Sequence, residues 1–212
     1  KQVGIWDGTV KATVPTVQAL NQVCKDLADL NMPIFSLLQP KLVTGDYATL
    51  IDCATCESEF VSQVIGHDPS GYGTQLTGSV QTGMIGETLG AMASSQVHTS
   101  LAWVEKQNMV TGFYKNTVTN AFHGTRELDT LGFVGGNVYS DFTPAQIDAL
   151  DAKGYIFLRK HVDIAGSYFN HSRTCAALTS DYLYAENTRT MNKAQRVVYK
   201  SLTPKLSSPA YI

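Results

Sequence analysis

Charged residues are scarce in this sequence. Only 16% of its 212 residues are Asp, Glu, Lys or Arg, against roughly 25% in an average soluble domain. The 16 basic and 18 acidic residues leave a net charge of −2 and form no basic run. This argues against nucleic acid as a partner, because phosphate binding depends on clustered Lys and Arg. A hydrophobic content of 43% excludes general disorder, and a surface poor in charge suits self-association.

Long apolar runs are also missing. No stretch approaches the roughly 20 continuous apolar residues of a membrane span, and residues 1–4 contain no apolar signal region. We therefore expect a soluble protein without a membrane partner. The sequence begins without Met and stops soon after Ala210, so we expect a fragment of a longer polypeptide.

Cysteine is too rare and too irregularly spaced for a secreted disulfide framework. The four cysteines are Cys24, Cys53, Cys56 and Cys175, and this usage favours a reducing compartment. Cys53 and Cys56 have the C-x-x-C spacing of redox and zinc sites. A metal would need two more ligands, for which His67 and His171 are available. The pair falls near the end of a short predicted helix and not at a helix start, so we favour simple packing.

The spacings that mark catalytic and nucleotide sites are absent. Gly71, Gly73 and Gly78 do not match G-x-G-x-x-G, and no G-x-S-x-G elbow or H-E-x-x-H pair occurs. Asp181 and Glu186 are explained structurally, because an acidic residue suits a helix N-terminus. The residues alone therefore predict no catalytic, cofactor-binding or metal-ligating group, and no cofactor.

Hydrophobic periodicity predicts alternating helices and strands through the first half of the chain. A helix opens at Pro15 with Thr13 or Thr16 as its cap and ends near Asn31. Its expected apolar stripe consists of Val17, Leu20, Val23, Cys24, Leu27 and Leu30. The continuous apolar run at 33–38 predicts a buried central strand. Further elements are expected as a short helix at 45–53, a strand at 60–66, a loop at 67–83, a helix at 84–93 and a strand at 100–104.

The second half adds a hairpin and a long helix. Between Phe113 and Gly136 the pattern is weak, with a helical turn at 116–122 and a strand at 131–134 as options. Thr143 and Pro144 open a helix that Gly154 ends, and strands at 155–162 and 166–170 form an antiparallel pair. The predicted fold class is α/β: a mixed, partly parallel sheet flanked by helices, with an appended antiparallel hairpin and a long C-terminal helix.

The last helix carries a clear apolar stripe. The residues Tyr184, Met191, Ala194, Val198 and Leu202 recur at helical spacing in a segment without Gly or Pro. We expect this stripe to pack on the sheet that contains residues 155–162. Arg196 and Lys200 would then lie in solvent, and a charge at Met191 would unfold the domain.

Three segments together resemble the conserved core of contractile phage tail sheath proteins. Residues 153–162 end a strand near Arg159-Lys160, residues 166–174 contain Gly-Ser-Tyr-Phe-Asn and an Arg173-Thr174 step, and residues 179–194 contain Asp181-Tyr182 and Glu186-Asn187-Thr188-Arg189. Upstream, residues 89–93 and 97–106 look like the helix and strand pair of that family. The resemblance spans residues 14–202, although the segment 113–137 does not match it.

The resemblance implies a structural subunit and not an enzyme. Such subunits stack as hexameric rings around a tail tube and change their packing on contraction to drive the tube through a host envelope. The implied partners are further copies of the chain, the tube protein, the baseplate and the tail terminator. The implied location is the virion tail sheath, assembled in the bacterial host cytoplasm. Residues 1–212 would form one sheath-like core domain that lacks the N- and C-terminal linking arms, and related injection devices share this fold.

Charged residues in the matching segments are candidates for contacts between or within subunits. They are Arg159, Lys160, Arg173, Asp181, Glu186 and Arg189. Arg173 and Asp181 could equally join the hairpin to the last helix inside one subunit. Contraction would move a rigid domain between alternative polar interfaces.

Two other readings stay open at this point. An α/β enzyme would have its site at the carboxyl ends of the strands, near the loop 67–83 and its His67, Asp68 and Tyr72. An adhesin or binding module would use an exposed group of the ten tyrosines.

Overall fold

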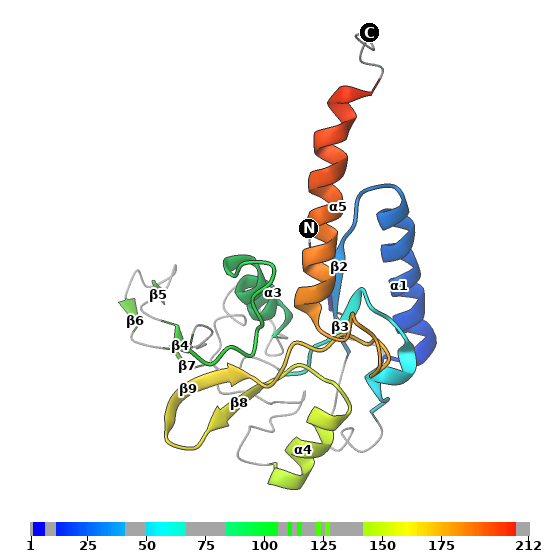
Figure 1. The fold of residues 1–212 in the computed structure, drawn as a ribbon. Helices are drawn as coiled ribbons and strands as arrows, with labels where there is room; N and C mark the ends of the chain where they lie inside the picture. The colour runs from blue at the N-terminus through cyan, green and yellow to red at the C-terminus, as the bar shows by residue number, and fades with distance from the viewer. Residues whose placement is uncertain are drawn as a thin grey trace.

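A parallel three-stranded sheet forms the centre of the molecule (Figure 1). The computed structural model describes residues 2–6, 12–40, 50–66, 84–105 and 142–206, and the two-residue strands at 110–111, 114–115, 122–123 and 126–127. The sheet has the order β1 (Gln2–Trp6), β2 (Phe35–Gln39), β3 (Val61–Gln63). All five residues of β2 are buried, which confirms the predicted central strand.

The first strand was not predicted. β1 pairs with β2 along its whole length, but five residues that include a glycine carry little strand signal. A Cβ added at Gly4 would lie 2.6 Å from Cδ1 of Leu89 in helix α3 (Ile85–Ser94). The glycine therefore serves the close approach of the strand to this helix.

Helices cover both faces of the sheet. On one face, α1 (Val14–Asp29), the 3-10 helix η2 (Cys53–Cys56) and α4 (Pro144–Ala152) enclose a core that includes Val17, Leu38 and Leu150. On the other face, α3 and the start of α5 (Ala185–Leu202) enclose a second core that includes Leu37 and Met92. Alternate residues of β2 enter the two cores, as the period of a strand requires.

The helix boundaries agree with the capping signals. Oγ1 of Thr13 accepts a hydrogen bond from the backbone N of Thr16 at 3.4 Å. Thr143 and Gln146 form a reciprocal capping box at the start of α4. Gly154 follows α4 with φ +83°, and a Cβ there would lie 3.2 Å from Cβ of Cys53. Any other residue would be strained at this turn.

The predicted apolar stripe of α1 is partly wrong. The fully buried positions are Val17, Asn21 and Cys24, whereas Val23 and Leu30 are 52% and 64% exposed. Oδ1 of Asn21 accepts the backbone N–H of Phe60 at 3.0 Å. A polar side chain thus lies on the buried face because a backbone donor there needs an acceptor.

The hairpin extends the sheet at β3. Strands β8 (Leu158–His161) and β9 (Ile164–Phe169) are antiparallel. Just before β8, Ile156 forms a parallel bridge with Val64 through two backbone hydrogen bonds of 2.9 Å, one to Ile65 and one to Gln63. The mixed α/β fold with an appended hairpin is confirmed.

The other expected elements have mixed outcomes. The strand expected at 100–104 is wrong, because this segment forms turns in which the N of Trp103 bonds to the O of Ser100. Of the short helix expected at 45–53, residues 45–49 lie outside the described residues, residues 50–52 are not helical, and the 3-10 helix η2 begins only at Cys53, capped by Asp52. In the weak segment, β4 (Val110–Thr111) pairs with β7 (Arg126–Glu127), and β5 (Tyr114–Lys115) pairs with β6 (Phe122–His123). The loop 67–83, most of the helical turn 116–122 and the strand 131–134 lie outside the described residues.

Candidate functional site

The buried face of α5 is polar. Five side chains at helical spacing donate hydrogen bonds to backbone carbonyls of other segments. The pairs are Thr188 to Glu59 at 3.0 Å, Arg189 to Met92 at 2.6 Å, Asn192 to Ile34 at 3.3 Å, Gln195 to Ala28 at 2.6 Å and Arg196 to Pro33 at 3.3 Å. The inner side of α5 is therefore held against the neighbouring segments by hydrogen bonds and not by an apolar stripe.

The acceptors explain this arrangement. Ala28 and Met92 lie in the last turns of α1 and α3, where helical carbonyls lack the usual donor four residues on, and the O of Ala28 also accepts the backbone N–H of Asn31 at 2.9 Å. Pro33 and Ile34 precede β2, and Glu59 precedes β3. Buried carbonyls need hydrogen bonds, and α5 supplies the donors. The direction of α5 is thus set by four neighbouring sites: the ends of α1 and α3 and the residues before β2 and β3.

The apolar stripe of α5 faces outward, so the packing predicted for it is wrong. Met191, Val198 and Leu202 are 53%, 55% and 56% exposed, and Tyr184 is also exposed. Arg196, expected in solvent, is half-buried by its bond to Pro33, whereas Lys200 is exposed as predicted. Periodicity identified an amphipathic helix correctly, but the sequence could not reveal that the carbonyl ends around it would bind the polar side.

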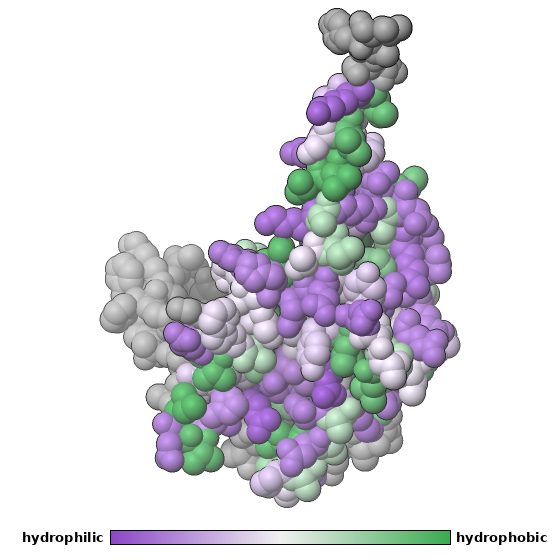
Figure 2. Space-filling view, viewed as in Figure 1, coloured by the Kyte–Doolittle hydropathy of each residue, from purple (hydrophilic) through white to green (hydrophobic). Residues whose placement is uncertain are grey.

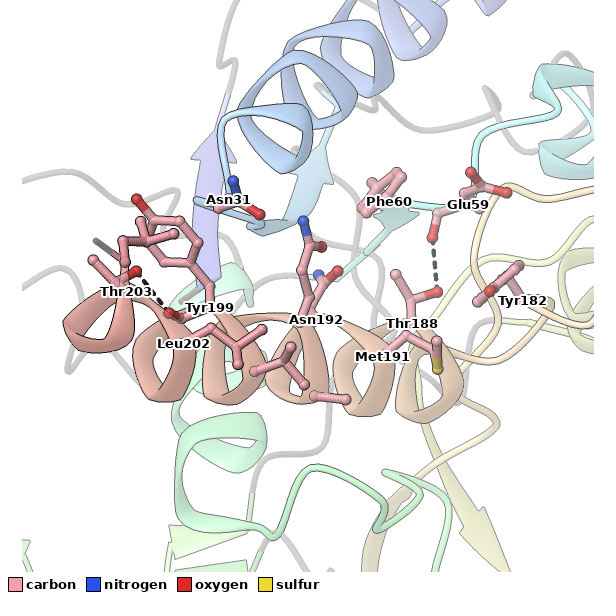
Figure 3. A pocket seen from close by; sticks show the side chains of 14 residues that line it. Asn31, Glu59, Phe60, Tyr182, Thr188, Met191, Asn192, Tyr199, Leu202 and Thr203 are labelled. Atoms are coloured by element: carbon pink, nitrogen blue, oxygen red, sulfur yellow. Dashed lines mark hydrogen bonds between the residues drawn. The ribbon is translucent and has the colours of Figure 1, made fainter. Parts of the chain in front are cut away.

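An apolar groove is lined by most of this outward stripe together with Thr188, Asn192 and Gln195 of the inner side. Its volume is about 740 Å³, and Figure 3 shows it between α5, the end of α1 and the segment before β3. The C-terminal turns of α5 project past the rest of the described chain (Figure 1), and apolar side chains gather on them (Figure 2). The lining residues are Asn31, Glu59, Phe60, Tyr182, Thr188, Met191, Asn192, Ala194, Gln195, Val198, Tyr199, Leu202, Thr203 and Leu206.

The exposed part of α5 and of the turn after it is basic beside the groove, with Lys193, Lys200 and Lys205 in solvent. Among the described residues, the one charged side chain that lines the groove itself is Glu59. From Asn187 to Leu206 the sequence has five basic residues and no acidic one. They are Arg189, Lys193, Arg196, Lys200 and Lys205. Exposed apolar patches of this kind mark protein interaction sites, and the flanking charge favours a partner that is apolar with acidic neighbours. The groove is therefore a candidate protein interface.

The six predicted contact residues do not gather at this groove. Arg159 and Lys160 lie on β8. Nη1 of Arg173 donates to the carbonyl of Asp151 at 3.4 Å, which ties the segment after β9 to α4. The backbone O of Asp181 accepts from Nδ2 of Asn187 at 2.7 Å.

The other two members lie at the start of α5. Oε2 of Glu186 accepts from Oγ of Ser172 at 2.5 Å. Arg189 is buried, and this burial lowers its pKa while nearby Glu186 opposes the shift. Met191, Val198 and Leu202 line the groove but were predicted from the sequence to lie in the core. Tyr199 and Phe60 also line the groove, and no pattern in the sequence pointed to them.

The C-x-x-C pair lies in the core with a third thiol. Cys53, Cys56 and Cys175 are buried, and no cysteine of the chain forms a disulfide. The Cys56 pKa is raised by a hydrogen bond to Cys175 and by burial, and the Cys175 pKa is raised first by a hydrogen bond to Cys53. Among the described residues, no group of three or more His, Cys, Asp and Glu could hold a metal ion. Cys175, 119 positions after Cys56 in the sequence, was not foreseen in this cluster.

His171 occupies a second buried polar cluster. Nδ1 accepts the backbone N–H of Arg173 at 3.1 Å, and Nε2 lies 4.0 Å from Oδ1 of Asp151. Asp151 is already bound by Nδ2 of Asn170 at 2.8 Å. Burial lowers the pKa of His171 to about 4, against the opposing effect of Asp151. The cluster joins α4 to the end of the hairpin.

The fold is similar to that of a contracted sheath chain. A chain of the contracted helical sheath of the anti-feeding prophage is similar at 15% identity and a TM-score of 0.50, over 99% of this chain and 49% of its own length. A chain of the baseplate of the anti-feeding prophage is similar at 17% identity and a TM-score of 0.49, over 97% and 47%. This chain thus spans about half the length of these proteins.

The chain belongs to the DUF2586 family. The model of the DUF2586 N-terminal domain matches residues 3–173. No curated protein matches the sequence. Among the described residues, no helix has the length and apolar character needed to cross a membrane.

Proposed function

We propose that this chain is a structural component of a contractile injection system, and specifically part of a sheath subunit. The observation that carries the proposal is the similarity of almost the whole chain to the contracted sheath of the anti-feeding prophage. The hairpin and helix motifs that resemble tail sheath proteins support it independently. A fold alone does not define a function, so the groove beside α5 supplies the chemical argument for assembly.

The occupant proposed for the groove is a second copy of the chain. Two α5 helices would oppose like charges, because the flanks of this helix are basic. The exposed face of α1 has the complementary character: Val23, Asp26 and Leu30 follow one another at spacings of three and four. Contact between α5 of one copy and α1 of the next uses two different surfaces, and such contacts repeat into rings or helices.

The proposed role includes the place of the subunit in the particle. The subunit would form rings around a tail tube, contact the baseplate and terminator at the ends, and change its packing on contraction. It would act in a particle and not as an enzyme. The contact residues on the hairpin, Arg159 and Lys160, would serve further interfaces of this particle.

Two adjacent valines provide a matched test. Val197 and Val198 are each 55% exposed, but only Val198 lines the groove. The full-length polypeptide is expressed and its assemblies are measured by sedimentation and electron microscopy. We expect tubes or stacked rings, which Val198→Glu removes and Val197→Glu leaves intact, while both variants melt like the parent.

Two results would overturn the proposal. A parent protein that stays monomeric and turns over a substrate would favour the enzyme reading, whose loop 67–83 lies outside the described residues. Equal effects of the two valine variants would show that the groove is not part of the interface.

A charge exchange tests the α1 contact: Asp26→Lys should weaken assembly, and adding Lys200→Asp should restore it.

A further inference from the structure

A smaller cavity lies beside the same helix, and Asn192 lines both this cavity and the apolar groove. Its volume is about 200 Å³, and its floor includes Phe35 of β2 and Met92 of α3. Its polar lining comes from Arg189, Asn192 and Arg196 of α5, from Gln2 of β1 and from Ser95, whose Oγ donates to the O of Ala91. No acidic side chain lines it. Two guanidinium groups and two amides thus surround a space that has no negative charge of its own.

Arg189 has unused hydrogen-bonding capacity in this cavity. Its side chain is 5% exposed, and Nη2 donates to the carbonyl of Met92. Among the described residues, Nε has no hydrogen-bond partner. A buried donor without an acceptor is unfavourable. The nearest acidic residue along the helix, Glu186, already accepts a hydrogen bond from Ser172.

We propose that this cavity binds a carboxylate, held between Arg189 and Arg196. Guanidinium groups recognise carboxylates through paired N–H donors, and the amides of Asn192 and Gln2 can complete the site. Small-molecule pockets usually measure roughly 300–1,000 Å³, so this cavity suits the end of an Asp or Glu side chain on a neighbouring protein chain. A free small carboxylate has the same chemistry, and the experiment separates the two sources.

Arg173 provides an internal control for Arg189. Nε of Arg173 is also buried without a partner, but the cavity that Arg173 lines measures only about 10 Å³. That space cannot admit a carboxylate. Arg173 therefore shares the unpartnered Nε with Arg189 and differs in the space beside it.

The test is a titration of the ¹⁵N-labelled chain observed at the arginine Nε–Hε resonances. Sodium acetate is compared with sodium chloride at equal ionic strength. We expect a saturable shift of the Arg189 resonance with acetate that chloride does not reproduce, and no shift of the Arg173 resonance. Arg196→Gln should weaken acetate binding about tenfold or more, as expected for the loss of a charged hydrogen-bond donor. Lys193→Gln, an exposed change on the same helix, should not.

A second variant shows whether weaker binding could result from misfolding of α5. Gln2→Ala removes one amide of the cavity without a change in α5, and it should weaken binding while the melting temperature is kept. A peptide with one Glu is then compared with its Gln counterpart. Tighter binding of the Glu peptide than of acetate identifies a protein side chain as the ligand, whereas equal binding identifies a free carboxylate. Equal shifts with acetate and chloride, or equal effects of Arg196→Gln and Lys193→Gln, would overturn the proposal.

Discussion

At the scale of single residues, buried polar groups connect segments that are distant in the sequence. His171 joins the end of β9 to Asp151 in α4, and Asn170 contacts Asp151 and the backbone O of Tyr155. Such groups must be satisfied inside the protein, and each restricts the ways in which its segments can pack.

The burial of His171 predicts a stability that depends on pH. The pKa of His171 is about 4 in the folded chain, against 6.5 for an unperturbed histidine in the unfolded chain. Between these two pH values the unfolded chain therefore binds more protons than the folded chain. Stability is therefore complete above about pH 6.5 and is lost as the pH falls towards 4, by roughly 3 kcal/mol. Urea unfolding at several pH values measures this. His171→Gln should flatten the curve, and an unchanged slope in that variant would contradict the prediction.

The cysteines are predicted to be unreactive in the folded chain. All four are buried, and burial raises the Cys24 pKa. A hydrogen bond to Cys175 raises the Cys56 pKa, and a hydrogen bond to Cys53 raises the Cys175 pKa. Only the thiolate reacts as a nucleophile. Ellman's reagent at pH 8 should therefore label no cysteine in buffer and all four in guanidinium chloride. Rapid labelling of Cys53 or Cys56 in buffer would instead indicate a redox role.

At the scale of elements, α5 has an inner side that is polar and an outer side that is apolar. The adjacent positions Met191 and Asn192 separate these sides. Met191→Asp should change the free energy of unfolding by no more than about 0.5 kcal/mol, as at other exposed positions. Asn192→Leu should cost about 1–3 kcal/mol, because the carbonyl of Ile34 loses its donor. Thermal and urea unfolding of the two variants measure these changes. A larger loss of stability in Met191→Asp than in Asn192→Leu would instead support the packing predicted from the sequence, with the apolar stripe buried.

At the scale of the whole molecule, the two cores share the central strand. Leu37 and Leu38 of β2 belong to different cores, so a change on one face of the sheet is transmitted to the other. Leu37→Ala should cost about 2–5 kcal/mol of a total that is typically about 5–15. Calorimetry should still show one transition at a lower temperature. Two separate transitions would mean that the cores unfold independently.

The sequence by itself determined the class of fold and most element positions. The caps at Thr13 and Thr143, the apolar run of β2 and the hairpin motif are local signals, and each acts within a few residues. They were enough to predict the mixed α/β fold and the resemblance to sheath proteins. The strand at 100–104 failed because local hydrogen bonds of Ser100 favour turns there, and β1 was too short to be recognised.

Only the tertiary structure decided which face of α5 is buried. The amphipathic pattern has two sides, and the sequence contains no information on the carbonyls of Ala28, Pro33, Ile34, Glu59 and Met92 that meet the helix. These acceptors come together only when α1, α3 and the starts of β2 and β3 are in place. Because buried carbonyls must be paired, the polar side of α5 faces the other segments, and the apolar side is left exposed at the groove.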